Sequence, residues 1–315
     1  MWVRVEALAH FITTHAPVTL LSGAGLSTPS GIPCYRDHGR SPAVIDGTVP
    51  PPSPMTADAF AASAATRRRY WARSYVGYPR TVAAVPSAGH LAAVALTMLP
   101  AGLTTAHVTQ NVDGLLGVAG GGDAVVELHG SVHRVVCMDC GARSSRAELQ
   151  ADLARLNPGW PEVATATTTR PDGDAELPST ALEYFVMAPC RSCGSTERAP
   201  DLVFFGGSLR PDIRAAAAAA IDASHGVLGL GSSFTVYSAY GLLVRSAARG
   251  GAVALLNYGA TRADGLAALK VEARVDHTLA AVAALLGAGG AGGDGGSDDD
   301  RLGGAGGGDG VRHRS

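Results

Sequence analysis

Short β-prone runs alternate with alanine-rich helical stretches along most of the 315 residues. Such alternation favours a parallel sheet flanked by helices, because each parallel strand needs a helical crossover to return to the same edge. We therefore expect a Rossmann-like α/β fold. The predicted strand runs are 18–21, 107–109, 125–128, 202–205, 227–230 and 253–256.

Two segments break this rhythm. Residues 134–199 are rich in Thr, Pro and Arg and are framed by two cysteine pairs, which indicates a smaller inserted domain. Residues 288–315 are dominated by glycine and aspartate, so we expect a disordered tail with almost nothing to bury. The ordered domain would then span 1–287, with its larger part made of 1–133 and 200–287.

Composition and charge exclude several classes of function. Apolar residues make up 46% of the chain, and the formal net charge is −2, so no strong field would hold nucleic acid or an anionic membrane. No apolar run reaches membrane-spanning length, and residues 1–17 lack the apolar core of a signal peptide. We expect a cytoplasmic protein without nucleic-acid or membrane partners, and its oligomeric state stays open.

Four of the five cysteines form two C-x-x-C-G motifs, and the fifth is Cys34. Each two-residue spacer lets both thiolates face one ion, and the following glycine accepts a tight turn. Four thiolates leave no open position for water, so the predicted zinc is structural. A redox role is less favoured, because two matched pairs are present. The predicted ligands are Cys137, Cys140, Cys190 and Cys193.

A glycine motif follows the first predicted strand. The missing side chains of Gly23 and Gly25, beside Ala24, would let backbone N–H groups approach a pyrophosphate near a helix N-terminus. Thr28 stands where the dinucleotide fingerprint has its third glycine. Alone, the motif fits a plain strand-to-loop turn equally well.

Further blocks accompany the glycine motif: SGIPCYR at 30–36, TQNVDG at 109–114, ELHG at 127–130, the two cysteine pairs, VFFG at 203–206, GSS at 231–233 and Asn257. In this order they resemble the sirtuin family over nearly the whole chain before the tail. RYWAR at 69–73 and RPDGD at 170–174 resemble its class II branch. Two departures are Leu116, where the family usually has histidine, and Cys34, where it commonly has an acidic residue.

The resemblance implies an NAD-dependent protein-lysine deacylase with a structural zinc. NAD and an acylated-lysine protein would enter the cleft between the two domains. The acyl carbonyl oxygen would displace nicotinamide from the ribose, and the products would be nicotinamide, free lysine and O-acyl-ADP-ribose. Two alternatives stay open: mono-ADP-ribosyl transfer from the same NAD site, and a non-catalytic NAD- and zinc-binding interaction module.

By this resemblance His129 is the general base, and an imidazole that titrates near neutrality suits proton removal from a ribose hydroxyl. Asn111 and Asp113 are further catalytic candidates, since an amide and a carboxylate offer the donors and acceptors that nicotinamide needs. An Asx turn after a strand is the alternative for both. His90 is expected to pack or to cap a helix.

The remaining site residues are also carried over by resemblance. The cofactor-binding candidates are Gly23, Ala24, Gly25, Ser27, Ile32, Pro33, Tyr35, Arg36, Gln110, Asn111, Val112, Asp113, Gly231, Ser232, Ser233, Asn257, Tyr258, Gly259 and Val275. The substrate candidates, expected on an exposed strand edge that could pair with a peptide, are Val203, Phe204, Phe205 and Gly206. An ordinary buried strand is the alternative for Phe204 and Phe205.

Tyr70 and Arg73 lie three positions apart on a predicted helix, so they share a face. A phenol and a guanidinium there could hold a carboxylate together. Sirtuins that remove acidic acyl groups use such a pair, and we expect plain acetyl-lysine not to be the best substrate.

Overall fold

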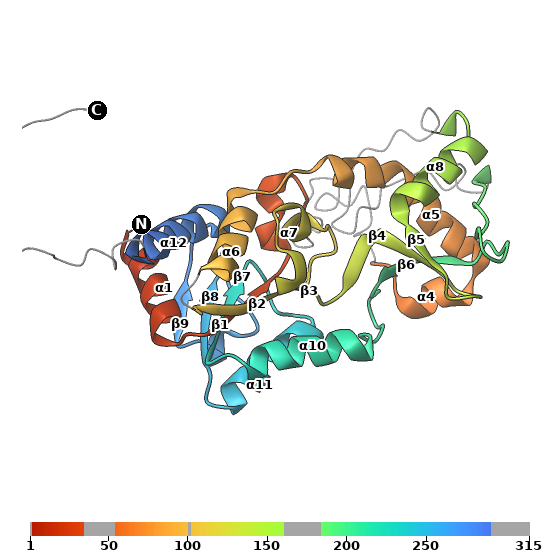
Figure 1. The fold of residues 1–315 in the computed structure, drawn as a ribbon. Coiled ribbons are helices and arrows are strands. Elements are labelled where there is room, and N and C mark those ends of the chain that lie inside the picture. The colour runs from red at the N-terminus through yellow and green to blue at the C-terminus, as the bar shows by residue number, and fades with distance from the viewer. Residues whose placement is uncertain (1, 35–53, 100–101, 161–183, 291–315) are drawn as a thin grey trace, which may run out of the picture.

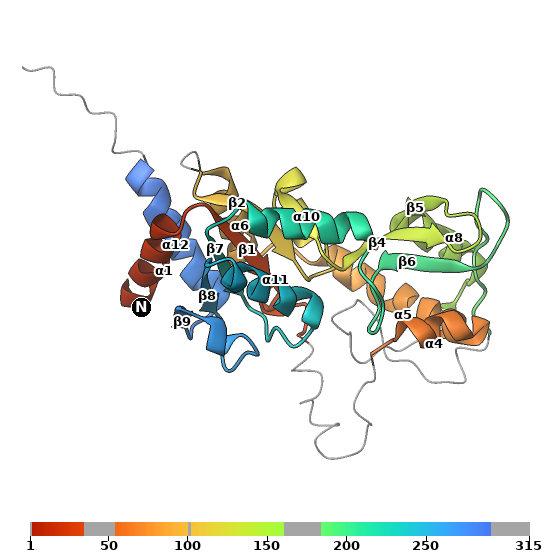
Figure 2. The ribbon, with the colours of Figure 1, turned by 90° about the horizontal axis from the view of Figure 1, so that it is seen from below.

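The computed structural model describes residues 2–34, 54–99, 102–160 and 184–290. These residues form a larger and a smaller body that lie side by side (Figure 1; Figure 2). Tyr35, Arg36 and residues 291–315 of the predicted tail lie outside the described residues.

Six parallel strands form the sheet of the larger body. They are β1 (Val18–Ser22), β2 (Thr104–Thr109), β3 (Val125–Glu127), β7 (Gly226–Leu230), β8 (Ala252–Leu256) and β9 (Leu269–Val271). Their order across the sheet is β3-β2-β1-β7-β8-β9. Every position of β1 and β7 is buried, as expected for mostly apolar strands that are covered on both faces.

Helices cover both faces of this sheet (Figure 1). On one face, α1 (Trp2–Thr14), α6 (Ala88–Met98) and α12 (Val275–Gly290) share a core with the strands. On the other face, α10 (Pro211–Asp222) and α11 (Tyr237–Ala248) complete a second core. The predicted parallel sheet flanked by helices is thereby confirmed.

Two features near the C-terminal end of the described chain were not anticipated. The edge strand β9 has only three residues, too few to produce a recognisable pattern in the sequence. Helix α12 continues to Gly290, beyond the predicted boundary at 287. Its glycines follow an apolar stretch that packs on α6, so the helix persists into the glycine-rich sequence.

The strand order places a change of direction beside β1. From β1 the chain builds outward through β2 and β3, and it later returns to place β7 on the other side of β1. Ligands of open α/β sheets bind outside the carboxyl ends of strands at such a point. Short helical turns occupy the connecting loops: η1 (Ala24–Leu26), η2 (Thr28–Ser30), α7 (Leu115–Val118), η3 (Gly122–Ala124) and η5 (Asp264–Leu266).

Among the described residues, the smaller body contains a three-stranded antiparallel sheet and three helices. They are α4 (Ala57–Ala62), α5 (Ala64–Ala83), β4 (Gly130–Cys137), β5 (Arg143–Ser145), α8 (Arg146–Leu156) and β6 (Arg198–Leu202). The strand order is β5-β4-β6. Phe60 and Trp71 from α4 and α5 share one core with Val135 and Leu149 from the insert. The sequence division had assigned 57–83 to the larger part, whereas this shared core joins both helices to the smaller body.

One predicted strand takes a different course. The run 202–205 was expected in the parallel sheet, but only Leu202 is in a strand, and that strand belongs to the small antiparallel sheet. Phe204 packs against the core of the smaller body, and Gly206 has a φ of 77°, which turns the chain away. Aromatic β-propensity produced the prediction, and the packing of Phe204 overrode it.

A buried arginine lies in the smaller body. The guanidinium of Arg146 is 4.4 Å from the ring centroid of Tyr78 and 5.3 Å from that of Trp71. Its Nη2 donates to Ser74 Oγ at 3.4 Å. Burial lowers the pKa of Arg146 to about 10, against the opposing effect of the nearby tyrosines. Aromatic faces thus supply much of the environment of this cation.

The only lysine of the chain is Lys270, on β9. Its Nζ lies 2.7 Å from Asp264 Oδ2 and 3.3 Å from Glu272 Oε1. The hydrogen bond to Asp264 raises the pKa of Lys270. The amine is therefore held protonated between two carboxylates.

Within the described ranges, no single helix is long and apolar enough to cross a membrane. The helices α5 and α6 reach that length and apolarity only together, and a bend of 66° separates them.

Candidate active site

The loops after β1 and β7 meet where glycines permit close approach. A Cβ atom on Gly23 would lie 2.7 Å from Ser232 Cβ, and one on Gly25 would lie 2.8 Å from Gly231 O. Gly23 N donates to Leu230 O at 2.9 Å, and Gly25 N donates to Gly231 O at 2.8 Å. These two amides join the loops instead of facing a phosphate, which differs from the sequence expectation.

The rest of the first loop is mostly packed inward. Ala24 begins η1, so a 3₁₀ turn stands where a helix N-terminus was expected. Ser27 is 1% exposed, and Ile32 is also buried. Pro33 is half-buried, two positions before the first residue that the structure does not describe.

Ser27 is the centre of a buried hydrogen-bond network. Its hydroxyl donates to Asp113 Oδ2 at 2.7 Å and accepts from Asn111 Nδ2 at 2.9 Å. Ser87 N donates to His90 Nδ1, so the proton of neutral His90 is on Nε2, which donates to Ser27 Oγ at 3.2 Å. One donated and two accepted bonds saturate the Ser27 hydroxyl. This residue therefore positions Asn111 and Asp113, in place of the phosphate contact expected for it.

Asp113 and His90 are each fixed by a helix start. Asp113 Oδ1 accepts from Leu115 N at 2.9 Å at the beginning of α7, and His90 forms a capping box with Ser87 at the start of α6. The predicted capping role of His90 is confirmed. Burial lowers the pKa of His90, and Asp113 opposes that shift, so the ring stays neutral at neutral pH.

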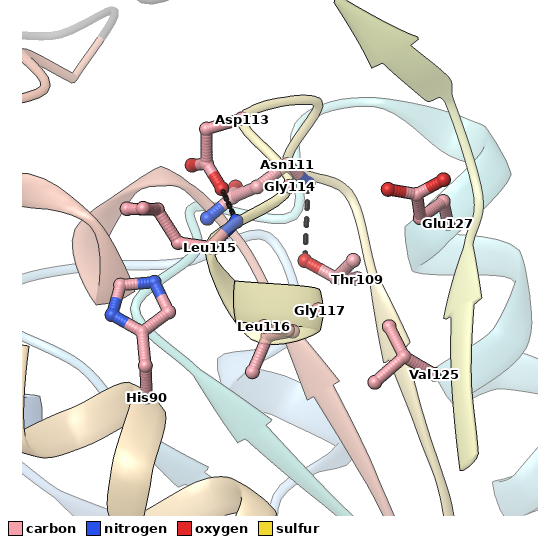
Figure 3. A pocket seen from close by; sticks show the side chains of 10 residues that line it. All are labelled: His90, Thr109, Asn111, Asp113, Gly114, Leu115, Leu116, Gly117, Val125 and Glu127. Atoms are coloured by element: carbon pink, nitrogen blue, oxygen red, sulfur yellow. Dashed lines mark hydrogen bonds between the residues drawn. The ribbon is translucent and has the colours of Figure 1, made fainter. Parts of the chain in front are cut away.

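A small pocket opens beside this network (Figure 3). Its polar side is formed by His90, Asn111, Asp113 and Glu127. Leu116, which stands where the sirtuin family usually has a histidine, adds a buried apolar side chain to the lining. An amide, a carboxylate and a neutral imidazole thus meet apolar side chains around a space of about the size of one water molecule. The complete lining is His90, Thr109, Asn111, Asp113, Gly114, Leu115, Leu116, Gly117, Val125 and Glu127.

Gln110 joins three strand ends. Its Nε2 donates to Ser22 O at 3.1 Å and to Ser232 Oγ at 3.0 Å. Its backbone O lies 3.0 Å from His129 Nδ1. The loop after β2 is therefore tied to the loops after β1, β7 and β3. Val112 contributes through its carbonyl, which accepts from Val132 N at 2.9 Å.

His129 follows β3 and is half-buried. A carbonyl can only accept, so Nδ1 carries the proton of the neutral ring and donates to Gln110 O. The lone pair is then on Nε2, which lies 2.8 Å from Ser238 Oγ. Burial lowers the pKa of His129, although the bond to Gln110 raises it. A neutral imidazole with a fixed tautomer at the carboxyl edge of the sheet suits a general base.

The loops after β7 and β8 complete the edge. Ser232 Oγ accepts from Phe234 N at 3.1 Å, and Phe234 has a φ of 52°, a left-handed conformation that a non-glycine residue rarely adopts. Ser233 O accepts from Arg262 N at 2.9 Å. Such strain is tolerated where the surroundings hold the backbone in place, which here is beside the predicted cofactor loop.

The loop after β8 contains three of the predicted cofactor-binding residues, Asn257, Tyr258 and Gly259. Asn257 is buried, and its Nδ2 donates to Tyr258 O at 3.2 Å and to Gly259 O at 3.1 Å. Tyr258 is 77% exposed, so its ring is accessible. Val275 is buried at the start of α12, where it packs in the core of the larger body.

The predicted substrate segment links the two bodies. Val203 N donates to His129 O at 2.9 Å. Phe205 uses both backbone groups, because its N donates to Met55 O at 3.3 Å and its O accepts from Ala57 N at 2.9 Å. An extended peptide would therefore have to pair with groups other than those of Phe205. Because Val203 N bonds to His129 O, a peptide bound along this segment would lie near His129.

Tyr70 lies behind the substrate segment. Its side chain is 3% exposed, and its ring is edge-on to that of Phe204 at a centroid distance of 5.3 Å. Arg73 is half-buried one helical turn further along α5. The predicted pair thus lies on the helix that packs against the substrate segment.

The four predicted zinc ligands come together at one end of the smaller body. Their sulfur atoms all lie within 4.8 Å of one another, with Cys137 to Cys193 at 3.6 Å and Cys140 to Cys190 at 3.8 Å. Thiolates about 2.3 Å from a tetrahedral zinc ion are about 3.8 Å apart, so the cluster fits this ion. Arg191, inside the second cysteine pair, donates from Nη2 to Asp152 Oδ1 at 3.0 Å and ties the site to α8.

The structure adds polar contacts that the sequence did not indicate. His133 Nε2 donates to Asp113 O at 2.7 Å, so its Nδ1 accepts from Tyr78 OH at 3.2 Å. Tyr78 in turn lies against Arg146. A chain of contacts therefore runs from the core of the smaller body to the Asp113 loop. Ser238, at the start of α11, contacts the predicted base.

A doubly wound sheet with its polar loops at one edge, joined to a four-thiolate module, defines a class of nucleotide-dependent enzymes with a structural zinc. Within that class, the chain belongs to the Sir2 family, whose profile matches residues 23–238. The resemblance to sirtuins is thereby confirmed, and NAD and zinc are the cofactors of the fold.

Similar proteins extend over most of the chain. An NAD-dependent protein deacetylase of Xanthomonas campestris pv. campestris (strain B100) is 44% identical over 274 residues, covering 87% of this chain and 89% of that protein. NAD-dependent protein deacetylase 1 of Mycobacterium avium (strain 104) is 42% identical over 269 residues, covering 84% and 90%. A solved structure of Sir2 with a p53 peptide and NAD+ matches with a TM-score of 0.67 and 25% identity, over 90% of this chain and 98% of that chain.

Proposed function

We propose that this chain is an NAD-dependent protein-lysine deacylase that releases nicotinamide and O-acyl-ADP-ribose. The observation that carries the proposal is the geometry of His129, a neutral imidazole with its lone pair on Nε2, beside the Gln110 to Asp113 loop. The names of the similar proteins support the same reaction class.

The polar residues divide the work between binding and proton transfer. Asn111 and Asp113, fixed by Ser27, would orient the nicotinamide amide, and the rigid network avoids reorganisation during the reaction. NAD supplies the ribose carbon from which nicotinamide leaves. His129 Nε2 then accepts the proton of a ribose hydroxyl, and Nδ1 keeps its bond to Gln110.

The partners of this reaction are acylated-lysine proteins. The structure of Sir2 with a p53 peptide and NAD+ supports a peptide substrate for this fold. In this chain, the segment from Val203 to Gly206 connects the base to the smaller body, and we assign peptide contact to it.

Nicotinamide release in the presence of acyl peptides tests the proposal directly. Incubation with NAD and a panel of acyl-lysine peptides should release nicotinamide in proportion to the deacylated peptide. NAD loss that is equal with and without every peptide would refute the reaction. His129→Ala should retain NAD binding and lose deacylation, and near wild-type turnover would exclude the assigned base.

Mass spectrometry of the products separates deacylation from its main alternative. O-acyl-ADP-ribose and free lysine support the proposal. An ADP-ribosyl group attached to a protein side chain, with the acyl group still on lysine, supports mono-ADP-ribosyl transfer instead.

We also propose that an acyl group longer than acetyl, or one that carries an acid, is turned over faster than acetyl. Tyr70 contacts Phe204 of the substrate segment, and Arg73 follows it on the same helix, which supports a role for this pair near the acyl group. Acetyl, glutaryl and lipoyl peptides should be compared for kcat/KM. A clear acetyl preference refutes the broad proposal, and a glutaryl rate that is unchanged in Arg73→Met refutes the pair.

A cytoplasmic setting and the absence of nucleic-acid and membrane partners are also proposals. Four clustered thiols suit metal binding in a reducing compartment, and the net charge of −2 does not favour polyanions. Cell fractionation and a nucleic-acid shift assay test them. The division into 1–287 and a tail likewise stays a prediction, which limited proteolysis can test.

A further inference from the structure

The lone pair of the predicted base has an internal partner. Because Nδ1 of His129 donates to Gln110 O, the only basic atom of the neutral ring is Nε2. Ser238 Oγ lies 2.8 Å from that atom, and in the neutral state the serine hydroxyl must be the donor. Any other hydroxyl that gives a proton to Nε2 first has to replace this bond.

The position of Ser238 is set by the cofactor loop. Ser238 is in the first turn of α11 and follows the loop that contains Ser232. Ser232 Oγ accepts from Gln110 Nε2, and Gln110 O accepts from His129. Hydrogen bonds therefore connect His129 Nδ1 to Gln110 and Gln110 to Ser232. The chain leads from Ser232 to Ser238, which contacts the other nitrogen of the same imidazole.

We propose that Ser238 is a positioning residue that prepares His129 for proton transfer and stabilises the imidazolium that results. This inference rests on the proposed function of His129 as the base. A hydroxyl can donate to neutral Nε2 and, after rotation about its Cβ–Oγ bond, accept from protonated Nε2.

The proton balance is simple. The ribose O–H bond breaks and an Nε2–H bond forms, while the Ser238 O–H bond remains intact. Without Ser238, the half-buried imidazolium would lose the acceptor for its new N–H group. A hydrogen bond to a charged partner is stronger than one between neutral groups, so removal of Ser238 destabilises the imidazolium of His129 more than the neutral ring.

The experiment separates the steps before and after the proton transfer. Nicotinamide leaves before His129 acts, so exchange of labelled nicotinamide into NAD, in the presence of acyl peptide, measures the first step alone. In Ser238→Ala we expect exchange and KM for NAD to stay within about twofold of wild type. Formation of O-acyl-ADP-ribose should fall about 10- to 100-fold.

Two variants control for structure. Ser238→Thr keeps the hydroxyl and should restore at least half of the wild-type rate. Ser246→Ala lies on the same helix, where Ser246 is 2% exposed and its Oγ has no hydrogen-bond partner among the described residues. This control should retain both activities and the wild-type melting temperature.

Each outcome decides between the alternatives. Parallel loss of exchange and product formation in Ser238→Ala would show that Ser238 only maintains the loop, and a wild-type rate would show that His129 needs no such partner; both overturn the proposal. If wild-type protein shows no peptide-dependent exchange, the proposed function itself fails. A product-specific loss that threonine rescues supports the inference.

Discussion

The two bodies of the molecule are held together by different means. In the larger body, apolar strands are covered by helices on both faces, and two cores run through the sheet. In the smaller body, β4 and β6 share one core with α4, α5 and α8, and a buried arginine and a four-thiolate cluster lie in or beside it. Stability of the larger body is therefore spread over many apolar contacts, whereas that of the smaller body is concentrated in a few specific groups.

This difference shows where the enzyme is vulnerable. The larger body carries most of the polar network of the site, and the smaller body reaches it through single contacts such as that of His133 Nε2 with Asp113 O, where Tyr78 supports His133. Damage to the smaller body should therefore change the site without unfolding the sheet. The following experiments test that contrast.

The largest effect is expected from the loss of zinc. Chelation or Cys190→Ser should unfold the smaller body and abolish activity, because structural zinc sites contribute on the order of 10 kcal/mol to folding. Hydrogen exchange should become fast in β4 and α8 and stay slow in β7 and β8. Cys34→Ser, outside the cluster, is the control. Equal loss of protection in both bodies would break the comparison.

A smaller effect on stability is expected at low pH, from a buried histidine of the larger body. His107, on β2, donates from Nε2 to Ser22 Oγ, and its buried Nδ1 has no partner among the described residues. Burial lowers the pKa of His107 from 6.5 to about 3. The unfolded chain therefore takes up the proton first, and stability present above pH 6.5 is lost as the pH falls toward 3.

By pH 4 this group alone should cost about 3 kcal/mol. Urea unfolding gives the free energy of unfolding of wild type and His107→Gln at each pH between 7 and 4. The cost is the extra loss of this free energy in wild type as the pH falls. An identical pH dependence in the two proteins would show that His107 is not the origin of the acid sensitivity.

The link between the bodies predicts a weaker effect. Tyr78→Phe removes the hydrogen bond to His133 and should raise the half-saturating NAD concentration about fivefold, because Asp113 loses its support. Tyr75→Phe is the matched control, since Tyr75 lies on the same helix with the same 7% exposure and packs on Phe185. Titration of NAD binding with both variants tests the link, and equal behaviour of the two would contradict it.

The smallest effect is expected at the C-terminal end. Removal of 291–315, after the end of α12, should change the melting temperature by less than about 1 °C, because that sequence offers few apolar side chains to bury. Activity should be unchanged. A larger drop in melting temperature would show that these residues contribute to one of the two bodies.

The same contrast explains what the sequence could predict. The strand runs and the loops after them are local in the sequence, so the pattern indicated the parallel sheet and the residues at its carboxyl edge. The four zinc ligands could also be predicted from the sequence, because the spacing of the cysteines reflects the geometry of a single ion.

Contacts between distant residues could not be predicted. Ser238 meets His129 across 109 positions and Tyr78 meets His133 across 55, and no periodicity or motif marks either pair. The assignment of α4 and α5 to the smaller body has the same cause, since only packing reveals which core a helix joins. The inward role of Ser27 became visible only once its three polar neighbours were located.

The single lysine has a practical consequence. Lys270 is the only lysine among 315 residues, and its amine is ion-paired with Asp264 and Glu272. Lys270 is therefore the one position of this chain that could carry an acyl-lysine, so acyl-lysine detected at any other position in an assay originates from the added protein or peptide. An amine-reactive dye or resin would find a single lysine side chain among these 315 residues, which limits the attachment points for immobilised or fluorescence-based measurements.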